Sequence, residues 1–143
     1  MDGLDKTMEQ RVWQRVLNQS AGKQEDLRGL ILTAAEALAA SRSLAGSLAG
    51  RPREQMKRIL ELQQRNLQAL KGMQRLSGGQ NRPVKVDVES PRNALETQYY
   101  RIRKLRTEYT ARTADPEFGP IFQQLARREE EACCLLMEIL GSR

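Results

Sequence analysis

Apolar residues recur at helical spacing in four long segments of the chain. In residues 25–49 they fall three, four or seven positions apart, and the same spacing returns in residues 52–76, 91–112 and 115–140. This spacing puts the apolar residues on one face of a helix. The pattern therefore predicts four amphipathic helices. Their inward-facing residues are expected to be Leu27, Leu30, Ile31, Ala34, Ala37, Leu38, Ser41, Leu44, Ala45 and Leu48; Ile59, Leu62, Gln63, Asn66, Ala69, Leu70, Met73 and Leu76; Leu95, Tyr99, Ile102, Leu105 and Tyr109; and Phe122, Leu125, Ala126, Glu129, Ala132, Cys133, Leu136, Ile139 and Leu140.

The segments between these helices predict how the helices are connected. Gly50 ends the first helix and Pro52 suits the first turn of the second, so the two form an antiparallel hairpin with a tight turn. Residues 77–90 contain two glycines, a proline and alternating valines, which favour extended chain. Fourteen extended residues reach roughly 46 Å, and a helix of 24 residues is roughly 36 Å long. This connection is therefore long enough to return along the whole bundle.

The first twenty residues predict a short separate helix. Val12, Trp13, Val16 and Leu17 recur at helical spacing, and the sequence SAGK at residues 20–23 is expected to break the helix. Together these patterns predict an all-α fold: a single-domain four-helix bundle with one long crossover, plus the short N-terminal helix. The predicted parts are an N-terminal helical extension (1–23), a first helix hairpin (24–77), the crossover (78–90) and a second helix hairpin (91–143).

The charge of the chain favours a solvated helical surface. The chain of 143 residues has 24 Lys and Arg against 18 Asp and Glu, a net charge of +6. The basic residues are interleaved with Glu and Gln, and no aromatic stacking platform accompanies them. We therefore do not expect nucleic acid as a partner, although weak binding through the basic surface stays open as an alternative. No apolar run is long enough to span a bilayer, so we expect no membrane partner.

The residue types exclude several kinds of chemistry. The chain has no histidine, which rules out Ser-His-Asp and Cys-His catalytic groups, and it has no phosphate-binding glycine loop. Its two cysteines, Cys133 and Cys134, are neighbours on one helix and cannot easily bridge. The N-terminal residues are polar and acidic, so we expect no signal peptide there. We expect reduced thiols in a cytoplasmic protein that is not an enzyme.

Three stretches resemble the ferritin-like superfamily, and more narrowly its rubrerythrin-like bacterial branch. They are AEALAASRSLAG, ILELQQRNLQALKGM and EYTARTADPEFGPIFQQLARREEEACCLLMEILG. The resemblance covers roughly residues 25–140 and implies the four-helix bundle with a crossover. The family binds two metal ions through one Glu from each of two helices and a Glu-x-x-His pair from each of the other two.

The resemblance also implies which residues stand at the metal-ligand positions. Ala34 and Ile102 stand at the two Glu positions; Gln63 and Asn66 form one Glu-x-x-His pair, and Glu129 and Ala132 the other. Only Glu129 keeps a ligand. A register shift of one residue would place the last pair at Glu130 and Cys133 instead. We therefore expect no metal, no cofactor and no catalytic residues.

These observations predict a non-enzymatic ferritin-like protein that has lost its di-iron site. We expect it to act by protein association as a homodimer through the Trp13 segment, with a further protein partner left open. An alternative is a residual metal- or small-ligand-binding site in the bundle centre, around Gln63, Asn66, Tyr109 and Glu129. Glu129 lies among apolar positions on the fourth predicted helix, so we expect it to be buried and paired, with Arg106, Tyr109, Gln63 or Asn66 as its partner.

Overall fold

The computed structural model contains four α-helices in the part of the chain that it describes. It describes the backbone of residues 2–80, Val86 and 92–142, and within these the side chains of Gln10 and of residues 22 onward. The helices are α1 (Asp2–Ser47), α2 (Gly50–Leu76), α3 (Ala94–Thr110) and α4 (Gly119–Gly141). No residue in those ranges is in a strand. The predicted all-α, four-helix fold is confirmed for these residues.

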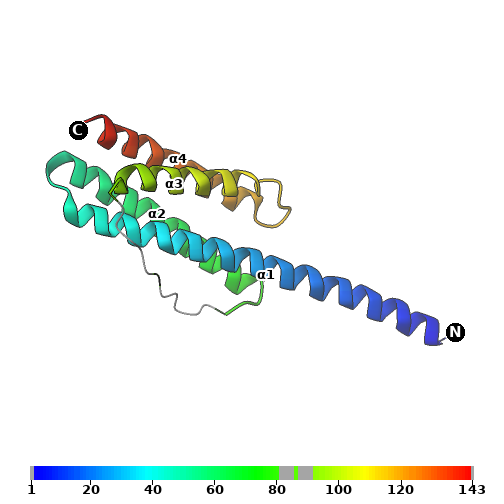
Figure 1. The fold of residues 1–143 in the computed structure, drawn as a ribbon. Coiled ribbons are helices and arrows are strands. Elements are labelled where there is room, and N and C mark those ends of the chain that lie inside the picture. The colour runs from blue at the N-terminus through cyan, green and yellow to red at the C-terminus, as the bar shows by residue number, and fades with distance from the viewer. Residues whose placement is uncertain (1, 81–85, 87–91, 143) are drawn as a thin grey trace.

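The helices form two antiparallel hairpins that lie side by side (Figure 1). α1 packs against α2 and α3, and α4 packs against α3 and α2. α2 and α3 run in the same direction, because α2 ends at one end of the bundle and α3 begins at the other (Figure 1). Most of the predicted crossover (78–90) lies outside the described residues, and so does residue 91, where the third helix was predicted to begin.

The predicted break at residues 20–23 is wrong, because α1 is one continuous helix. A single glycine such as Gly22 lowers helix stability by only about 1 kcal/mol. Contacts with distant parts of the chain hold the next residues in place: Gln24 Nε2 donates to the carbonyl oxygen of Ser77 (2.8 Å), and Lys23 Nζ donates to Glu117 (2.6 Å). The first half of α1 extends past the ends of the other helices (Figure 1). The side chain of Trp13 lies outside the described residues.

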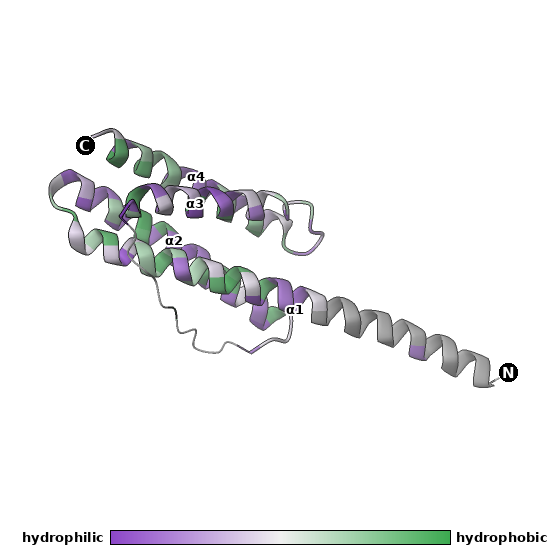
Figure 2. Ribbon diagram, viewed as in Figure 1, coloured by the Kyte–Doolittle hydropathy of each residue, from purple (hydrophilic) through white to green (hydrophobic). Residues whose placement is uncertain are grey.

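Apolar side chains fill the interior in two clusters along the bundle axis. Figure 2 shows the pattern as green turns separated by purple ones, with the C-terminal end of α4 mostly green. Most of the residues predicted to face inward are buried, but Leu76 is exposed and five are only half-buried: Leu48, Ala69, Tyr99, Ala126 and Leu140. Met56, Leu67 and Phe118 are buried although they were not predicted to be. The first cluster is Leu27, Leu30, Ile31, Ala34, Ala37, Leu38, Leu67, Leu70, Met73, Leu105, Tyr109, Phe118, Phe122 and Leu125; the second is Leu44, Ala45, Met56, Ile59, Leu62, Leu95, Ile102, Ala132, Cys133, Leu136 and Ile139.

The turn between α3 and α4 is held by local hydrogen bonds and by close packing. The Asp115 carboxylate accepts hydrogen bonds from the backbone N–H groups of Glu117 and Phe118, each 2.8 Å long. These bonds from an Asp side chain to the backbone two and three residues on hold the turn that precedes α4. A Cβ on Gly119 would collide with the carbonyl oxygen of Thr113. The turn therefore requires a glycine at the first position of α4.

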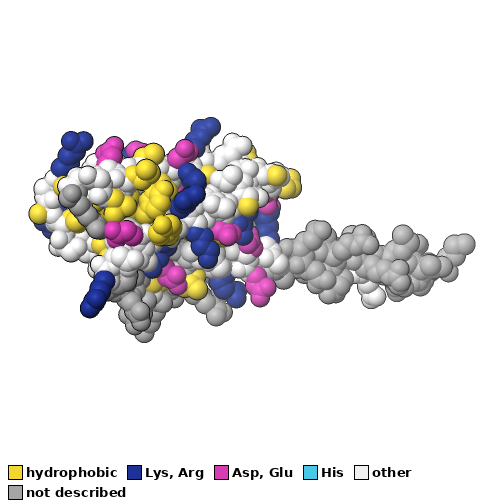
Figure 3. Space-filling view, turned by 45° about the horizontal axis from the view of Figure 1, so that its top comes forward, with side chains coloured by type: hydrophobic (Ala, Val, Ile, Leu, Met, Phe, Trp, Pro, Cys, Tyr) yellow, Lys and Arg dark blue, Asp and Glu magenta, His cyan; other side chains and the backbone are white. Residues whose placement is uncertain are grey.

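The described surface carries charges of both signs. Figure 3 shows Lys and Arg side chains interspersed with Asp and Glu, and a group of hydrophobic side chains over the end of the bundle where α4 finishes. Several basic residues are engaged in ion pairs, including Arg112 with Asp26 and Glu108. None of the helices among the described residues has an apolar stretch long enough to cross a membrane.

Candidate functional site in the bundle interior

All six residues at the predicted ligand positions lie in the interior of the bundle. Their exposed fractions run from 0% to 3%. The structure brings Asn66 and Glu129 into direct contact. Gln63 bonds elsewhere, and the remaining three positions, Ala34, Ile102 and Ala132, belong to the apolar clusters. One of the six positions thus supplies a carboxylate, two supply amides and three supply only packing.

Glu129 is buried and paired, as its position on the fourth helix predicted. It is 1% exposed, and its Oε1 accepts a hydrogen bond of 2.9 Å from Asn66 Nδ2. Glu130 is exposed, so the alternative register at Glu130 and Cys133 is wrong. Arg106, which we considered as a partner, makes no hydrogen bond or ion pair with Glu129 among the described contacts.

Burial controls the protonation of Glu129. Removal from water raises the pKa of this carboxyl from its ordinary 4.5 to about 7, and the hydrogen bond from Asn66 opposes the rise. The second carboxyl oxygen, Oε2, has no hydrogen-bond partner among the described residues. The carboxyl is therefore poised between its neutral and charged forms near neutral pH.

Asn66 links Glu129 to the backbone of α4 and to a basic side chain. Its Nδ2 also donates to the carbonyl oxygen of Leu125 (3.1 Å), and its Oδ1 accepts from Arg128 Nη1 (3.3 Å). The amide therefore uses both its donor and its acceptor atom within the α2–α4 interface.

A second buried network joins α1, α2 and α3. Ser41 Oγ donates to Gln63 Oε1 (2.6 Å), and Gln98 Nε2 donates to Ser41 Oγ (2.8 Å) and to the carbonyl oxygen of Ala37 (2.8 Å). Arg101 Nη1 donates to Gln98 Oε1 (2.7 Å). The network satisfies most of the polar atoms that α1, α2 and α3 bury at this level.

Gln98 is a buried polar residue of this network that the sequence analysis missed. The predicted seam placed Tyr99 inward, whereas Gln98 is fully buried and Tyr99 is half-buried. The spacing could have predicted its burial, because Leu95, Gln98 and Ile102 lie three and then four positions apart, as inward-facing residues of the other helices do. Tyr99 was predicted to face inward in preference to Gln98 because an aromatic side chain is the more usual core residue, and this prediction is wrong.

Tyr109 places a hydroxyl in the interior near Glu129. The residue is fully buried and its ring centroid lies 6.4 Å from that of Phe122. Burial raises the pKa of the phenol well above its usual range, and the charge of Glu129 raises it further. The hydroxyl has no hydrogen-bond partner among the described residues, and neither has Gln63 Nε2.

The donor set does not fit a di-metal centre. Such a centre takes several carboxylates together with imidazoles, and hard cations in general take oxygen ligands. Here a single carboxylate is available, the amide oxygen of Gln63 accepts from Ser41, and that of Asn66 accepts from Arg128. Across the described residues no three His, Cys, Asp or Glu side chains gather in a group that would hold a metal ion.

The two cysteines occupy different environments on α4. Both are free thiols; Cys133 is buried and Cys134 is exposed. Burial raises the pKa of the Cys133 thiol to about 11, although the charge of Arg106 opposes the rise. Cys133 therefore stays protonated at neutral pH and packs as a small apolar side chain.

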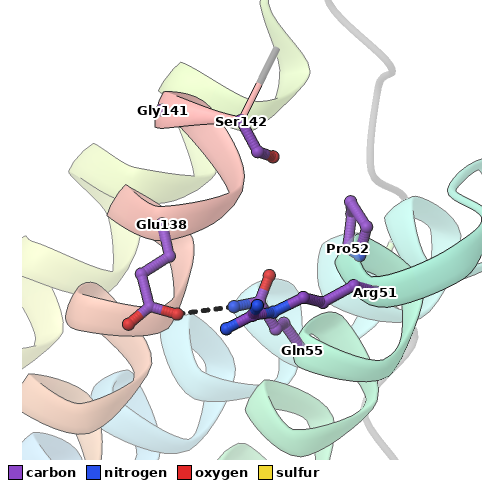
Figure 4. Close-up of a pocket in the computed structure, with 6 residues that line it drawn as sticks. All are labelled: Arg51, Pro52, Gln55, Glu138, Gly141 and Ser142. Atoms are coloured by element: carbon purple, nitrogen blue, oxygen red, sulfur yellow. Dashed lines mark hydrogen bonds between the residues drawn. The ribbon is translucent and has the colours of Figure 1, made fainter.

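A hollow of about 470 Å³ lies on the surface where α2 begins and α4 ends (Figure 4). Arg51, Pro52 and Gln55 line one side, and Glu138, Gly141 and Ser142 line the other. Gln55 Nε2 donates to Glu138 Oε2 (2.6 Å), which ties the two helices together. The lining carries one carboxylate and no nucleophile paired with a base, so it does not form a catalytic group.

Comparison of the chain with protein-family models, with curated proteins and with solved structures finds no match.

Proposed function

We propose that the protein is a ferritin-like bundle of the rubrerythrin-like type whose di-metal site is lost, and that it acts by association rather than by catalysis. The proposal places it in the cytoplasm as a homodimer. The observation that carries it is the filled interior: both amide oxygens at the ligand positions accept hydrogen bonds from protein side chains, and only one carboxylate is present.

The arrangement of the helices supports the ferritin-like assignment. Antiparallel hairpins with a parallel second and third helix are what a four-helix bundle with one long crossover produces. The resemblance implies that six residues face the bundle interior, and all six are buried: Ala34, Gln63, Asn66, Ile102, Glu129 and Ala132. Both features are properties of the fold, so they support the family and not a particular activity.

Metal analysis tests the loss of the di-metal site. Protein from iron- and manganese-supplemented growth, desalted and analysed by inductively coupled plasma mass spectrometry, is expected to hold no stoichiometric metal. A pair of metal ions per chain that disappears in Glu129→Ala would overturn the proposal. Glu130→Ala is the matched control, because Glu130 is adjacent but exposed.

Association through the N-terminal part of α1 is the second part of the proposal. This part of the helix extends beyond the bundle, and its sequence carries Val12, Trp13, Val16 and Leu17 at helical spacing. Monomeric proteins seldom leave such an apolar stripe uncovered. Sedimentation analysis of the purified chain is expected to show a dimer, and Trp13→Arg is expected to give a monomer that keeps its helix content. Gln14→Arg, one position along, is the control and should remain dimeric; a monomeric wild type would reject this part.

A small-ligand site in the bundle centre is the second candidate function. It rests on three of the four buried side-chain polar atoms that have no partner among the described residues: Gln63 Nε2, Tyr109 OH and Glu129 Oε2. Native mass spectrometry of the purified protein tests it, because a retained molecule adds mass that denaturation removes. Weak nucleic-acid binding is the third candidate, and an absent gel shift at low salt would discard it.

A further inference from the structure

Apolar positions in the first half of α1 lie in line with the positions that face the bundle core. α1 is one continuous helix, and eighteen residues make about five helical turns. Val12 and Trp13 stand eighteen residues before Leu30 and Ile31, and both of the later residues are buried. The apolar stripe that packs inside the bundle therefore continues along the part of α1 that extends past the other helices (Figure 1).

An exposed apolar residue lies at the end of the bundle from which this part of α1 extends. Leu76, the last residue of α2, is 76% exposed. The hydrogen bond from Gln24 Nε2 to the carbonyl oxygen of Ser77 (2.8 Å) places the end of α2 beside the residues of α1 that follow the extension. A helix packed along the apolar stripe would therefore reach the open end of the bundle.

The charges of the extension, residues 2–22, are divided between its two halves. Residues 2–9 hold three acidic residues and one lysine, whereas residues 10–22 hold two arginines and no acidic residue. Two copies packed in the same direction would bring like charges together. In opposite directions, the acidic half of each copy lies against the basic half of the other. The extension thus complements a reversed copy of itself, which favours a second copy of this chain as the partner.

We propose that two copies of the chain pair their α1 extensions in opposite directions, so that the N-terminal end of each copy covers Leu76 of the other. This geometry rests on the proposed homodimer and specifies its interface. The extension is roughly 32 Å long. When residues 2–22 overlap fully, Val12 lies at the centre of the overlap, and Asp5 lies opposite Gln19 of the partner subunit.

Disulfide cross-linking separates the two directions of pairing. Asp5→Cys and Gln19→Cys are made as separate variants in a Cys134→Ser background, which removes the exposed thiol. The two positions are fourteen residues apart, about four turns, so they lie on one side of the helix. Co-expressed and mildly oxidised, the two variants are expected to give a mixed cross-linked dimer, identified by its intact mass.

Each variant expressed alone is the control for the direction. Identical positions lie roughly 21 Å apart along the helix axis in the proposed dimer, so neither variant should cross-link with itself. Self-cross-linking of both variants without the mixed product would overturn the proposed direction while leaving the homodimer in place. A monomeric wild type in sedimentation analysis would reject the homodimer and the geometry together.

Leu76→Cys in the same background tests the contact with the bundle end. Its reaction with a maleimide should be several-fold slower in the dimer than after Trp13→Arg, which is expected to give a monomer with this end uncovered. Leu32→Cys is the matched control, because Leu32 is 44% exposed within the bundle part of α1 and should react equally in both. Equal rates at position 76 in the dimer and the monomer would overturn the contact between the N-terminal end and the bundle.

Discussion

The side-chain amide of Asn66 on α2 donates hydrogen bonds both to the carboxyl of Glu129 (2.9 Å) and to the carbonyl oxygen of Leu125 (3.1 Å) on α4. The two residues stand at positions that the family resemblance assigns to metal ligands. The two residues bond to each other, so this hydrogen bond joins α2 of one hairpin to α4 of the other.

Glu129→Gln is expected to fold with nearly the stability of the wild type at neutral pH, and Glu129→Leu to be less stable by about 1–3 kcal/mol. Glutamine keeps an oxygen that accepts from Asn66. Leucine removes this acceptor and must fit a branched side chain into a fully packed site. Urea denaturation of both variants at the same pH measures the difference. Equal stabilities would mean that the Asn66–Glu129 hydrogen bond contributes nothing.

The free energy of unfolding should depend on pH through Glu129. Its pKa is raised from 4.5 to about 7 in the folded chain, so between these values the folded state holds a proton that the unfolded state has released. The contribution of Glu129 is therefore complete below about pH 4.5, falls as pH rises toward 7, and is lost above it. The full change is on the order of 3 kcal/mol. The difference between wild type and Glu129→Gln, measured across this range, isolates the effect from other titrating groups; a flat difference would contradict it.

Ser41→Ala should destabilise the bundle by about 1–3 kcal/mol, although it removes a single oxygen. Ser41 donates to Gln63 and accepts from Gln98, so its loss leaves two buried amides each short of a partner. Ser43→Ala is the control, because Ser43 is exposed two positions further along the same helix. Thermal unfolding by circular dichroism compares the two. A cost no larger for Ser41 than for Ser43 would show that the network is not stabilising.

Gly119→Ala should be clearly destabilising, whereas Gly72→Ala should be neutral or stabilising by up to about 1 kcal/mol. A Cβ at Gly119 collides with the carbonyl oxygen of Thr113, while a Cβ at Gly72 meets no atom within 4 Å. Both glycines are helical, so the pair separates steric exclusion from helix propensity. Chemical denaturation of the two variants is the measurement, and similar effects would mean that the α3–α4 turn adapts to a side chain.

The interior of α2 and α4 could be predicted from the sequence because helical periodicity leaves little choice there. Gln63, Asn66 and Glu129 fall at seam positions between runs of apolar residues, and all three are buried. The end of α2 at Leu76 was also predictable, because two glycines follow it closely and Gly78 adopts a positive φ of 85°.

Other features depended on contacts between residues far apart in the sequence. The continuity of α1 rests on Lys23 and Gln24 reaching the α3–α4 turn and the end of α2. The burial of Gln98 rests on Ser41 and Ala37 of another helix supplying its partners. Local pattern and propensity carry no information about such partners, since they describe one helix at a time.

The sequence by itself determined that the chain forms amphipathic helices, which faces of α2 and α4 turn inward, and that histidine chemistry is excluded. Those properties follow from residue type and spacing along single helices. Only the tertiary structure decided which buried polar groups pair. Asn66 joins Glu129, Gln63 joins Ser41, and Tyr109 and one oxygen of Glu129 are left without partners among the described residues. Hydrogen bonds of about 3 Å depend on how the helices are placed against one another, and that placement is set by the packing of all four together.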